Sequence, residues 1–229
     1  MYIIFFLVSI SSFAVVDGKQ LFRADNNGLT EIEIEGILFM REEEKLARDI
    51  YLAFHEMYSS IPIFFNIANS EQKHMDAIKT LIDKYDLVDP VIGKEFGEFE
   101  NQDLQQLYFE LKSKGSESLI TALEVGAEIE EIDIIDLKNY ISKTNKEDII
   151  RIYKNLLRGS ENHLIAFVKV LKSQGVSYIP RHLSQEEFDD IINKNPRLYI
   201  ASRFDDFRGL FNFSLRNRIR NILSQLFKI

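Results

Sequence analysis

Cysteine is absent from this chain of 229 residues, and glycine and proline are scarce, at ten and four residues. Without cysteine the protein can form neither a disulfide bond nor a thiolate metal site, so any metal site must use carboxylates and imidazoles. The shortage of glycine and proline favours long uninterrupted helices over a fold with many turns. The sequence also contains no nucleotide-binding loop, no Ser-His-Asp arrangement and no zinc-protease motif.

Long hydrophobic runs are missing too, with one short exception at the start of the chain. Residues 3–16 are apolar apart from three serines, but this run is shorter than the roughly 20 residues that a membrane span needs. The small residues that follow predict a secretory signal peptide over residues 1–18, with cleavage after Ala14 or Gly18. Because no Lys or Arg precedes the run, a retained anchor is the alternative. The sequence therefore predicts a secreted or extracytoplasmic protein that is soluble once processed.

The net charge of −8 is spread unevenly along the chain. From Arg197 onward seven basic residues stand against two acidic ones, which leaves the preceding part with a net charge of −13. An acidic body does not favour nucleic acid as a partner. The basic amphipathic segment 204–227 predicts a helix that packs on the protein, and a membrane-surface or protein-binding helix is the alternative. A homodimer is also left open.

Helical patterns cover most of the chain, and no strand alternation stands out. Capping boxes at Thr30–Glu33 and Thr144–Glu147 mark the starts of two long helices. The expected long helices are residues 30–58, 63–85, 117–141 and 144–175, with short helices at 103–112 and 183–193. This pattern predicts an all-α fold: a four-helix bundle over residues 29–178, built from two hairpins joined by a long crossover, and a helical C-terminal extension over 179–229.

Acids and histidines occupy the apolar stripes of the four long helices, where hydrophobic residues are expected. Burying a carboxylate without a partner is costly, so a group of them facing one core indicates a positive ion between them. Within this group, two pairs lie three residues apart and therefore share a helix face. The candidate metal ligands are Glu43, Glu71, His74, Glu130, Asp133 and His163.

Neighbouring polar residues are expected to lie elsewhere. At about 100° of rotation per residue, Glu42 and Glu44 fall to either side of the stripe that contains Glu43. By the same argument, Glu131 is expected to point outward from its helix. Tyr51 lies near the edge of the first stripe, where core packing is a more common role than a hydrogen bond to a carboxylate.

Four segments of the chain are similar to a ferritin-like family known only as domain of unknown function 2202. They are residues 41–51 (REEEKLARDIY), 66–75 (NIANSEQKHM), 129–137 (IEEIDIIDL) and 157–164 (LRGSENHL). The resemblance extends over roughly residues 29–178 and implies a ferritin-like fold with iron, as a di-iron centre, although manganese or zinc is left open. It implies no established reaction.

One position departs from the pattern of the ferritin-like superfamily. A full di-iron site would have Glu-x-x-His on the fourth helix, but the matching residues are Ser160 and His163. Asp133 is a candidate to replace the missing carboxylate, and an unequal, single-metal or metal-free site is the alternative. The sequence thus leaves three functions open: a secreted metal-binding bundle of oxidase or iron-handling type, a non-enzymatic module with a metal-free polar core network, and a peripheral membrane protein that uses the basic tail.

Overall fold

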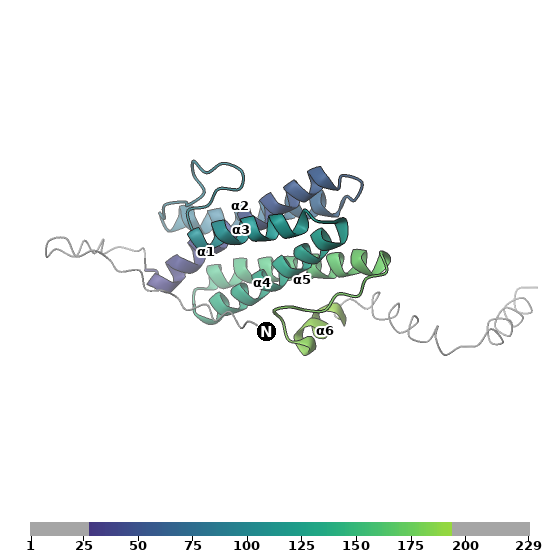
Figure 1. The fold of residues 1–229 in the computed structure, drawn as a ribbon. Helices are drawn as coiled ribbons and strands as arrows, with labels where there is room; N and C mark the ends of the chain where they lie inside the picture. Colours follow the sequence, from purple (N-terminus) through teal and green to yellow (C-terminus); the bar gives the residue numbers. More distant parts are fainter. Residues whose placement is uncertain (1–27, 194–229) are drawn as a thin grey trace, which may run out of the picture.

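The computed structural model describes residues 28–193, which form an all-helical structure (Figure 1). Its helices are α1 (Glu31–Met57), α2 (Ile63–Lys84), α3 (Gln102–Gly115), α4 (Leu119–Ser142), α5 (Glu147–Ser173) and α6 (Gln185–Asn193). The prediction of an all-α bundle is therefore confirmed. The predicted signal peptide at 1–18 and the predicted amphipathic helix at 204–227 lie outside the described residues. Within the described part of the chain, no helix is long and apolar enough to cross a membrane.

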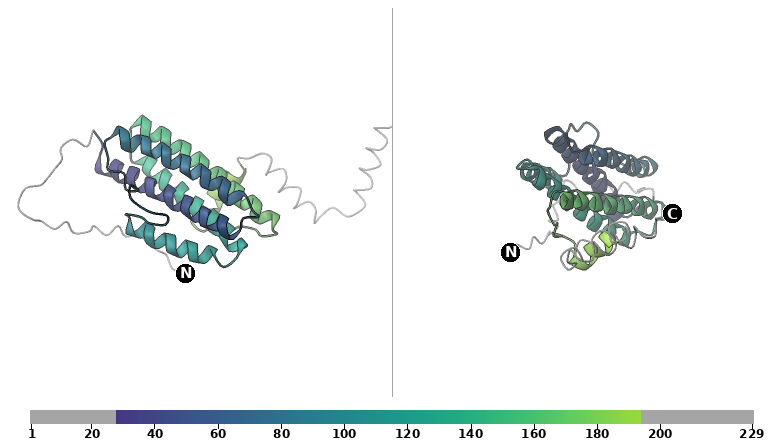
Figure 2. Two further views of the ribbon diagram at one scale, coloured as in Figure 1. Left: turned by 90° about the horizontal axis from the view of Figure 1, so that it is seen from above. Right: turned by 90° about the vertical axis from the view of Figure 1, so that its right-hand side faces the viewer.

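The four long helices form two hairpins that pack side by side (Figures 1 and 2). Helix α1 pairs with α2, α4 pairs with α5, and contacts between α1 and α4 and between α2 and α5 close the bundle. Glu33 meets Thr144 near one end of the α1–α4 seam, and Tyr51 meets Gly126 further along it, so these helices run antiparallel. The segment between α2 and α4, which contains α3, is the long crossover that this arrangement requires.

The starts of α1 and α4 follow local capping chemistry, whereas those of α2 and α5 have no side-chain cap. Thr30 and Glu33 form the expected capping box of α1, and Ser118 caps α4 with its side chain. The prediction that Thr144 caps the next long helix was wrong, because the N-cap of α5 is Lys146. The Thr144 hydroxyl instead donates to Glu33 Oε1 at 2.5 Å, and thereby joins the start of α1 to the α4–α5 turn.

Two apolar clusters fill the interior, and a polar centre lies between them. The larger cluster includes Phe54, Phe64 and Phe167, and the other includes Met40 and Tyr153. Both clusters contain residues from all four long helices. Burial of this apolar surface supplies the main stabilisation of the bundle, so the polar centre is held inside a rigid frame.

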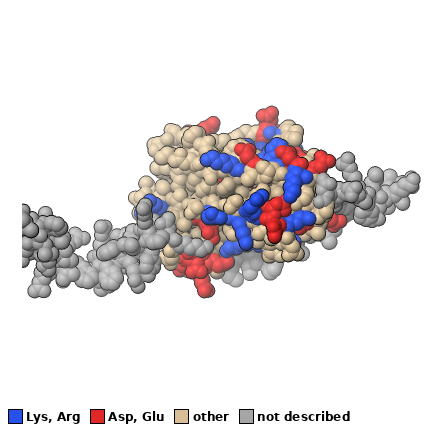
Figure 3. Space-filling model, turned by 180° about the vertical axis from the view of Figure 1, so that it is seen from behind, with Lys and Arg blue, Asp and Glu red and all other residues tan. Residues whose placement is uncertain are grey.

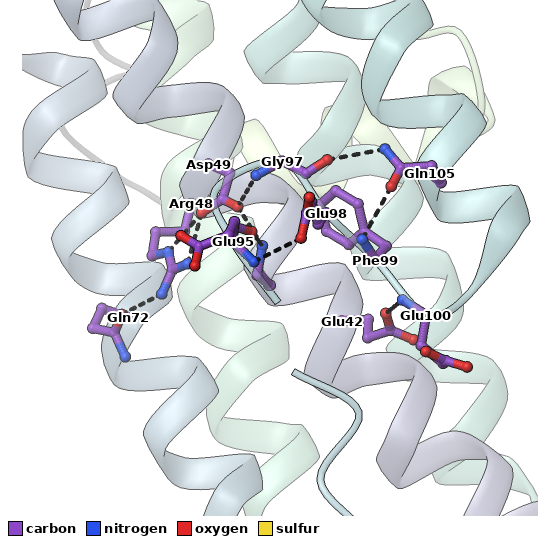
Figure 4. Close-up of polar contacts among 11 residues, drawn as sticks. Glu42, Arg48, Asp49, Gln72, Glu95, Gly97, Glu98, Phe99, Glu100 and Gln105 are labelled. Atoms are coloured by element: carbon purple, nitrogen blue, oxygen red, sulfur yellow. Dashed lines mark hydrogen bonds and ion pairs between the residues drawn. The ribbon is translucent and has the colours of Figure 1, made fainter. Parts of the chain in front are cut away.

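The crossover loop, residues 86–101, crosses the outer side of α1 and is held there by charged groups. Arg41 forms a buried ion pair with Asp89 at 3.0 Å. Asp49 pairs with Lys45 at 2.7 Å and accepts a hydrogen bond from the Gly97 backbone at 2.9 Å. The backbone N–H of Glu100 donates to Glu42 (Figure 4). Helix α1 is therefore buried on its outer side as well as on its inner side.

The expectation that Glu131 points outward was wrong. Its side chain is fully buried and accepts hydrogen bonds from the Tyr178 hydroxyl at 2.6 Å and from the backbone N–H groups of residues 181–183. One carboxylate thus fastens the segment between α5 and α6 to α4. Glu131 differs in this respect from the charged side chains on the surface shown in Figure 3, where basic and acidic residues lie side by side in solvent.

Replacing Glu131 should detach the C-terminal part of the described chain. We expect Glu131→Ala to lower the free energy of unfolding by about 3 kcal/mol, because it leaves several buried donors unpaired. Trypsin should then cut at Arg181 faster than in the wild type. Glu117→Gln, at an exposed residue, is the control for loss of one negative charge. Unchanged proteolysis of Glu131→Ala would contradict the anchoring role.

Candidate metal centre

Glu71 lies at the middle of the polar centre, on the inner face of α2. Its Oε2 atom is 2.7 Å from Nδ1 of His74, one helical turn further along α2. Its Oε1 atom is 2.8 Å from Nδ1 of His163, which α5 contributes from the opposite hairpin. The two oxygens of one carboxylate therefore face two imidazoles, and each imidazole presents the same ring nitrogen to it.

Two groups of side chains are arranged closely enough to hold a metal ion, and they share Glu71. The first consists of Glu44, Glu71 and His74, and the second of Glu71, Glu130 and His163. In each group the potential ligand atoms all lie within 4.8 Å of one another. A carboxylate common to two adjacent groups is the arrangement expected of a bridging ligand.

Glu44, rather than Glu43, is the acid that α1 contributes to the first group. Its side chain is buried, and its Oε2 atom is 3.2 Å from Nδ1 of His74. The expectation that Glu44 lies beside the stripe was therefore wrong. Glu43 is buried too and lines a small cavity together with Glu44 and Glu71, but the neighbouring acid that acts on it most strongly is Asp136.

The second group is supported by hydrogen bonds from residues around it. Tyr51 donates to Glu130 Oε1 at 2.6 Å, so this residue combines core packing with a hydrogen bond to a carboxylate. Nε2 of His163 is 3.0 Å from the hydroxyl of Ser70, while Nδ1 faces Glu71 and Glu130. Outer contacts of this kind fix the orientation of metal-binding histidines and carboxylates.

Asp133 and Ser160 are in contact at the position where the sequence comparison with ferritin-like proteins led us to expect a glutamate. The Ser160 hydroxyl donates to Asp133 Oδ2 and is also 3.0 Å from the backbone oxygen of Leu156. Asp133 Oδ1 accepts no hydrogen bond, and the residue lines the same cavity as Glu71 and Glu130. Helix α4 thus supplies a carboxylate next to the serine that stands where glutamate was expected.

The pKa values at the centre reflect burial opposed by the contacts between acids and imidazoles. Burial raises the pKa of Glu71, but His163 and His74 outweigh it and lower this pKa to about 2. Burial lowers the pKa of His74 and of His163, but the adjoining carboxylates raise them to about 12 and about 10. Burial raises the pKa of Glu44 to about 7, against the opposing effect of His74. In the metal-free protein, both imidazoles therefore act as the positive charges among the acids.

Several buried oxygen and nitrogen atoms of this cluster have no hydrogen-bond partner. Glu71 Oε1 and His163 Nδ1 are 2.8 Å apart, yet neither atom has a partner in hydrogen-bonding geometry. One oxygen of Glu44 and both oxygens of Glu43 are likewise buried without a hydrogen bond. A bound ion would give these lone pairs a partner, since buried polar groups are normally hydrogen-bonded.

Gly159 of α5 makes room for the His74 ring. A Cβ atom at this position would lie 2.5 Å from Nε2 of His74. Alanine favours a helix by about 1 kcal/mol over glycine, so Gly159→Ala would stabilise an unobstructed helix. We expect the opposite result, a lower melting temperature, because the ring must leave its contacts with Glu44 and Glu71.

Arg158→Ala, at the exposed neighbouring position, is the control for this substitution. Thermal unfolding of both variants, with nuclear magnetic resonance of the His74 ring, measures the effect. A Gly159→Ala variant that is more stable than the wild type and has unchanged His74 signals would contradict the close approach.

Comparison with known proteins assigns the chain to a family. The family described as "Uncharacterized protein domain (DUF2202)" matches residues 33–195. Uncharacterized protein MJ0754 of Methanocaldococcus jannaschii is 48% identical over 167 residues, which cover 73% of this chain and 90% of that protein. The crystal structure of hypothetical protein MJ0754 from Methanococcus jannaschii DSM 2661 matches with a TM-score of 0.71 and 46% identity, and covers 78% of this chain and 98% of that one. The chain therefore belongs to the DUF2202 family.

Proposed function

We propose that this protein is a ferritin-like metal-binding bundle that holds two metal ions, iron in the first instance, on either side of Glu71. The observation that carries the proposal is the position of Glu71 in two separate three-residue groups. Glu44 and His74 complete one position, and Glu130 and His163 complete the other. Asp133 stands beside both as a further carboxylate, next to Ser160.

The donor set fits a pair of divalent ions in charge as well as in position. Four carboxylates (Glu44, Glu71, Glu130 and Asp133) are buried at the centre, and they match the charge of two divalent cations when both imidazoles are neutral. Oxygen and imidazole ligands suit iron, manganese and zinc, and the chain has no thiolate to favour another metal. The metal-free alternative requires both imidazoles to stay protonated instead.

The chemistry would be of oxidase or iron-handling type. Two bound ferrous ions would supply electrons to oxygen or peroxide. The protein fixes the spacing of the ligands: Ser70 orients His163, Tyr51 orients Glu130, and the apolar clusters on either side exclude bulk water. Localisation outside the cytoplasm and membrane contact through the basic tail remain parts of the proposal that rest on residues outside the described range.

Single substitutions should separate the two positions. We expect Glu71→Gln to reduce uptake at both positions, because both use this carboxylate. Glu44→Gln should weaken one ion and Glu130→Gln the other, so that each variant retains about one ion per chain. The double variant Glu71→Ala/His74→Ala should take up none. Anaerobic titration with Fe(II), Mn(II) and Zn(II), followed by elemental analysis, measures the stoichiometry.

Ser160→Glu, which restores the superfamily residue, is expected to tighten the His163 position. Gln106→Glu, an exposed substitution that adds the same charge, is its control. Wild-type protein that stays metal-free with all three ions would reject the metal proposal. The cluster would then be a metal-free polar network. In that case, removing one of its side chains should destabilise the fold by about 3–5 kcal/mol.

Metal uptake should also release protons. Because the pKa of His74 is raised to about 12 and that of His163 to about 10, both are protonated between pH 6 and pH 8 in the metal-free protein. A ligand nitrogen must lose its proton, so each ion displaces at least one. We expect the affinity for each ion to fall by about tenfold for each unit of decreasing pH in this range. Calorimetry in buffers of different ionisation enthalpy counts the protons, and uptake without proton release would contradict coordination by histidine.

A further inference from the structure

The carboxylate of Glu43 is the buried group that the proposed centre does not use. The side chain is 4% exposed, and neither of its oxygens has a hydrogen-bond partner among the described residues. It lines the cavity that also contains Glu44, Glu71, Glu130 and Asp133. A charged carboxylate in such a place is costly unless a cation or a proton neutralises it.

Glu43 is linked to the surface through acids on the facing helix. Asp136 is the acid that acts most strongly on Glu43, and it is only partly buried. Asp133 and Asp136 are three residues apart on α4 and therefore share one face, with Asp133 on the side of the centre. Glu43 thus interacts with the partly exposed Asp136 as well as with Asp133 and Glu44 at the centre.

The surroundings of this series favour a cation. Beyond Asp136, the exposed Glu35 accepts a hydrogen bond from Tyr140 at 3.4 Å, which places a further acid near the outer end. Lys143 is the basic group that acts on Asp136. The two basic residues on the buried part of α1 do not neutralise these acids, because Arg41 pairs with Asp89 and Lys45 pairs with Asp49. Helix α3 covers another part of the same seam, where Lys114 pairs with Glu128 and Gly115 meets Phe54.

We infer that Glu43 and Asp136 form a transit site through which divalent cations reach the centre along the seam between α1 and α4. This inference rests on the proposed metal centre and adds its access route. Four carboxylates already match two divalent ions, so the Glu43–Asp136 pair is not needed as a ligand set. With two carboxylates and no imidazole it would hold an ion more weakly than the centre, as transfer requires.

The test measures the rate of uptake separately from the final occupancy. Metal-free protein is mixed rapidly with Co(II), and binding is followed by visible absorbance to its end point. We expect Glu43→Gln and Asp136→Asn each to slow uptake by about tenfold, since charges that line a path raise association rates by at least that factor. The final number of ions per chain should equal that of the wild type. The double variant should be at least as slow as the slower single variant, because both charges lie on one route.

Glu56→Gln is the matched control, since it removes the same charge from an exposed position of α1 far from the seam. It should take up Co(II) at the wild-type rate.

If both seam variants match this control in rate, the transit site is rejected while the centre stands. If Glu43→Gln lowers the final occupancy, Glu43 is a ligand and the transit role is also rejected. A wild type that binds no Co(II) would remove the proposed centre together with its route. Melting temperatures confirm that each variant is folded, and Asp136→Asn, at the half-exposed position, keeps the test available if Glu43→Gln does not fold.

Discussion

The structure depends on the cost of burying carboxylates at the middle of a helical bundle. Glu71 is 2% exposed, yet its pKa is lowered to about 2, because two imidazoles from different hairpins face its two oxygens. Removing either histidine would leave one oxygen of this buried carboxylate without its partner, which is far more costly than a missing surface ion pair. The contacts of His74 and His163 with this carboxylate therefore tie together the two hairpins as well as the ligand atoms.

The rest of the bundle supports this centre from both sides. Apolar clusters above and below it provide the rigid packing, and Tyr51 and Ser70 hold individual ligands from outside. The same strategy recurs away from the centre: Glu42, Asp49 and Glu131 are buried acids that bind backbone N–H groups and so fasten the crossover loop and the C-terminal segment. The chain thus uses its buried acids in two ways. Some fasten loops through complete sets of hydrogen bonds, and the others meet at the centre with oxygens that have no hydrogen-bond partner.

Hydrogen bonding separates the acids that fasten loops from the acids that are available to a bound ion. Glu131 accepts hydrogen bonds from four donors and needs no further partner. Glu43, Glu44, Glu71 and Asp133 keep at least one buried oxygen without a partner. Because buried polar groups are normally satisfied, the second class is where a bound ion would change the energetics most.

Sequence periodicity alone determined the all-α fold, the positions of the long helices within a few residues, and the placement of Glu71, His74, Glu130 and His163 on inner faces. It could do so because α2 and α5 each bury one stripe, so that a polar residue within the stripe stands out. On α1 the same reasoning chose Glu43 over Glu44, because the crossover loop covers the outer side of this helix and all residues from Met40 to Ala47 are buried. Glu131 was misplaced for a related reason, since the segment after α5 covers it. Only the tertiary structure decided which acid faces the centre, which one fastens a loop and which one lies on the seam. These roles depend on what packs against each face of a helix.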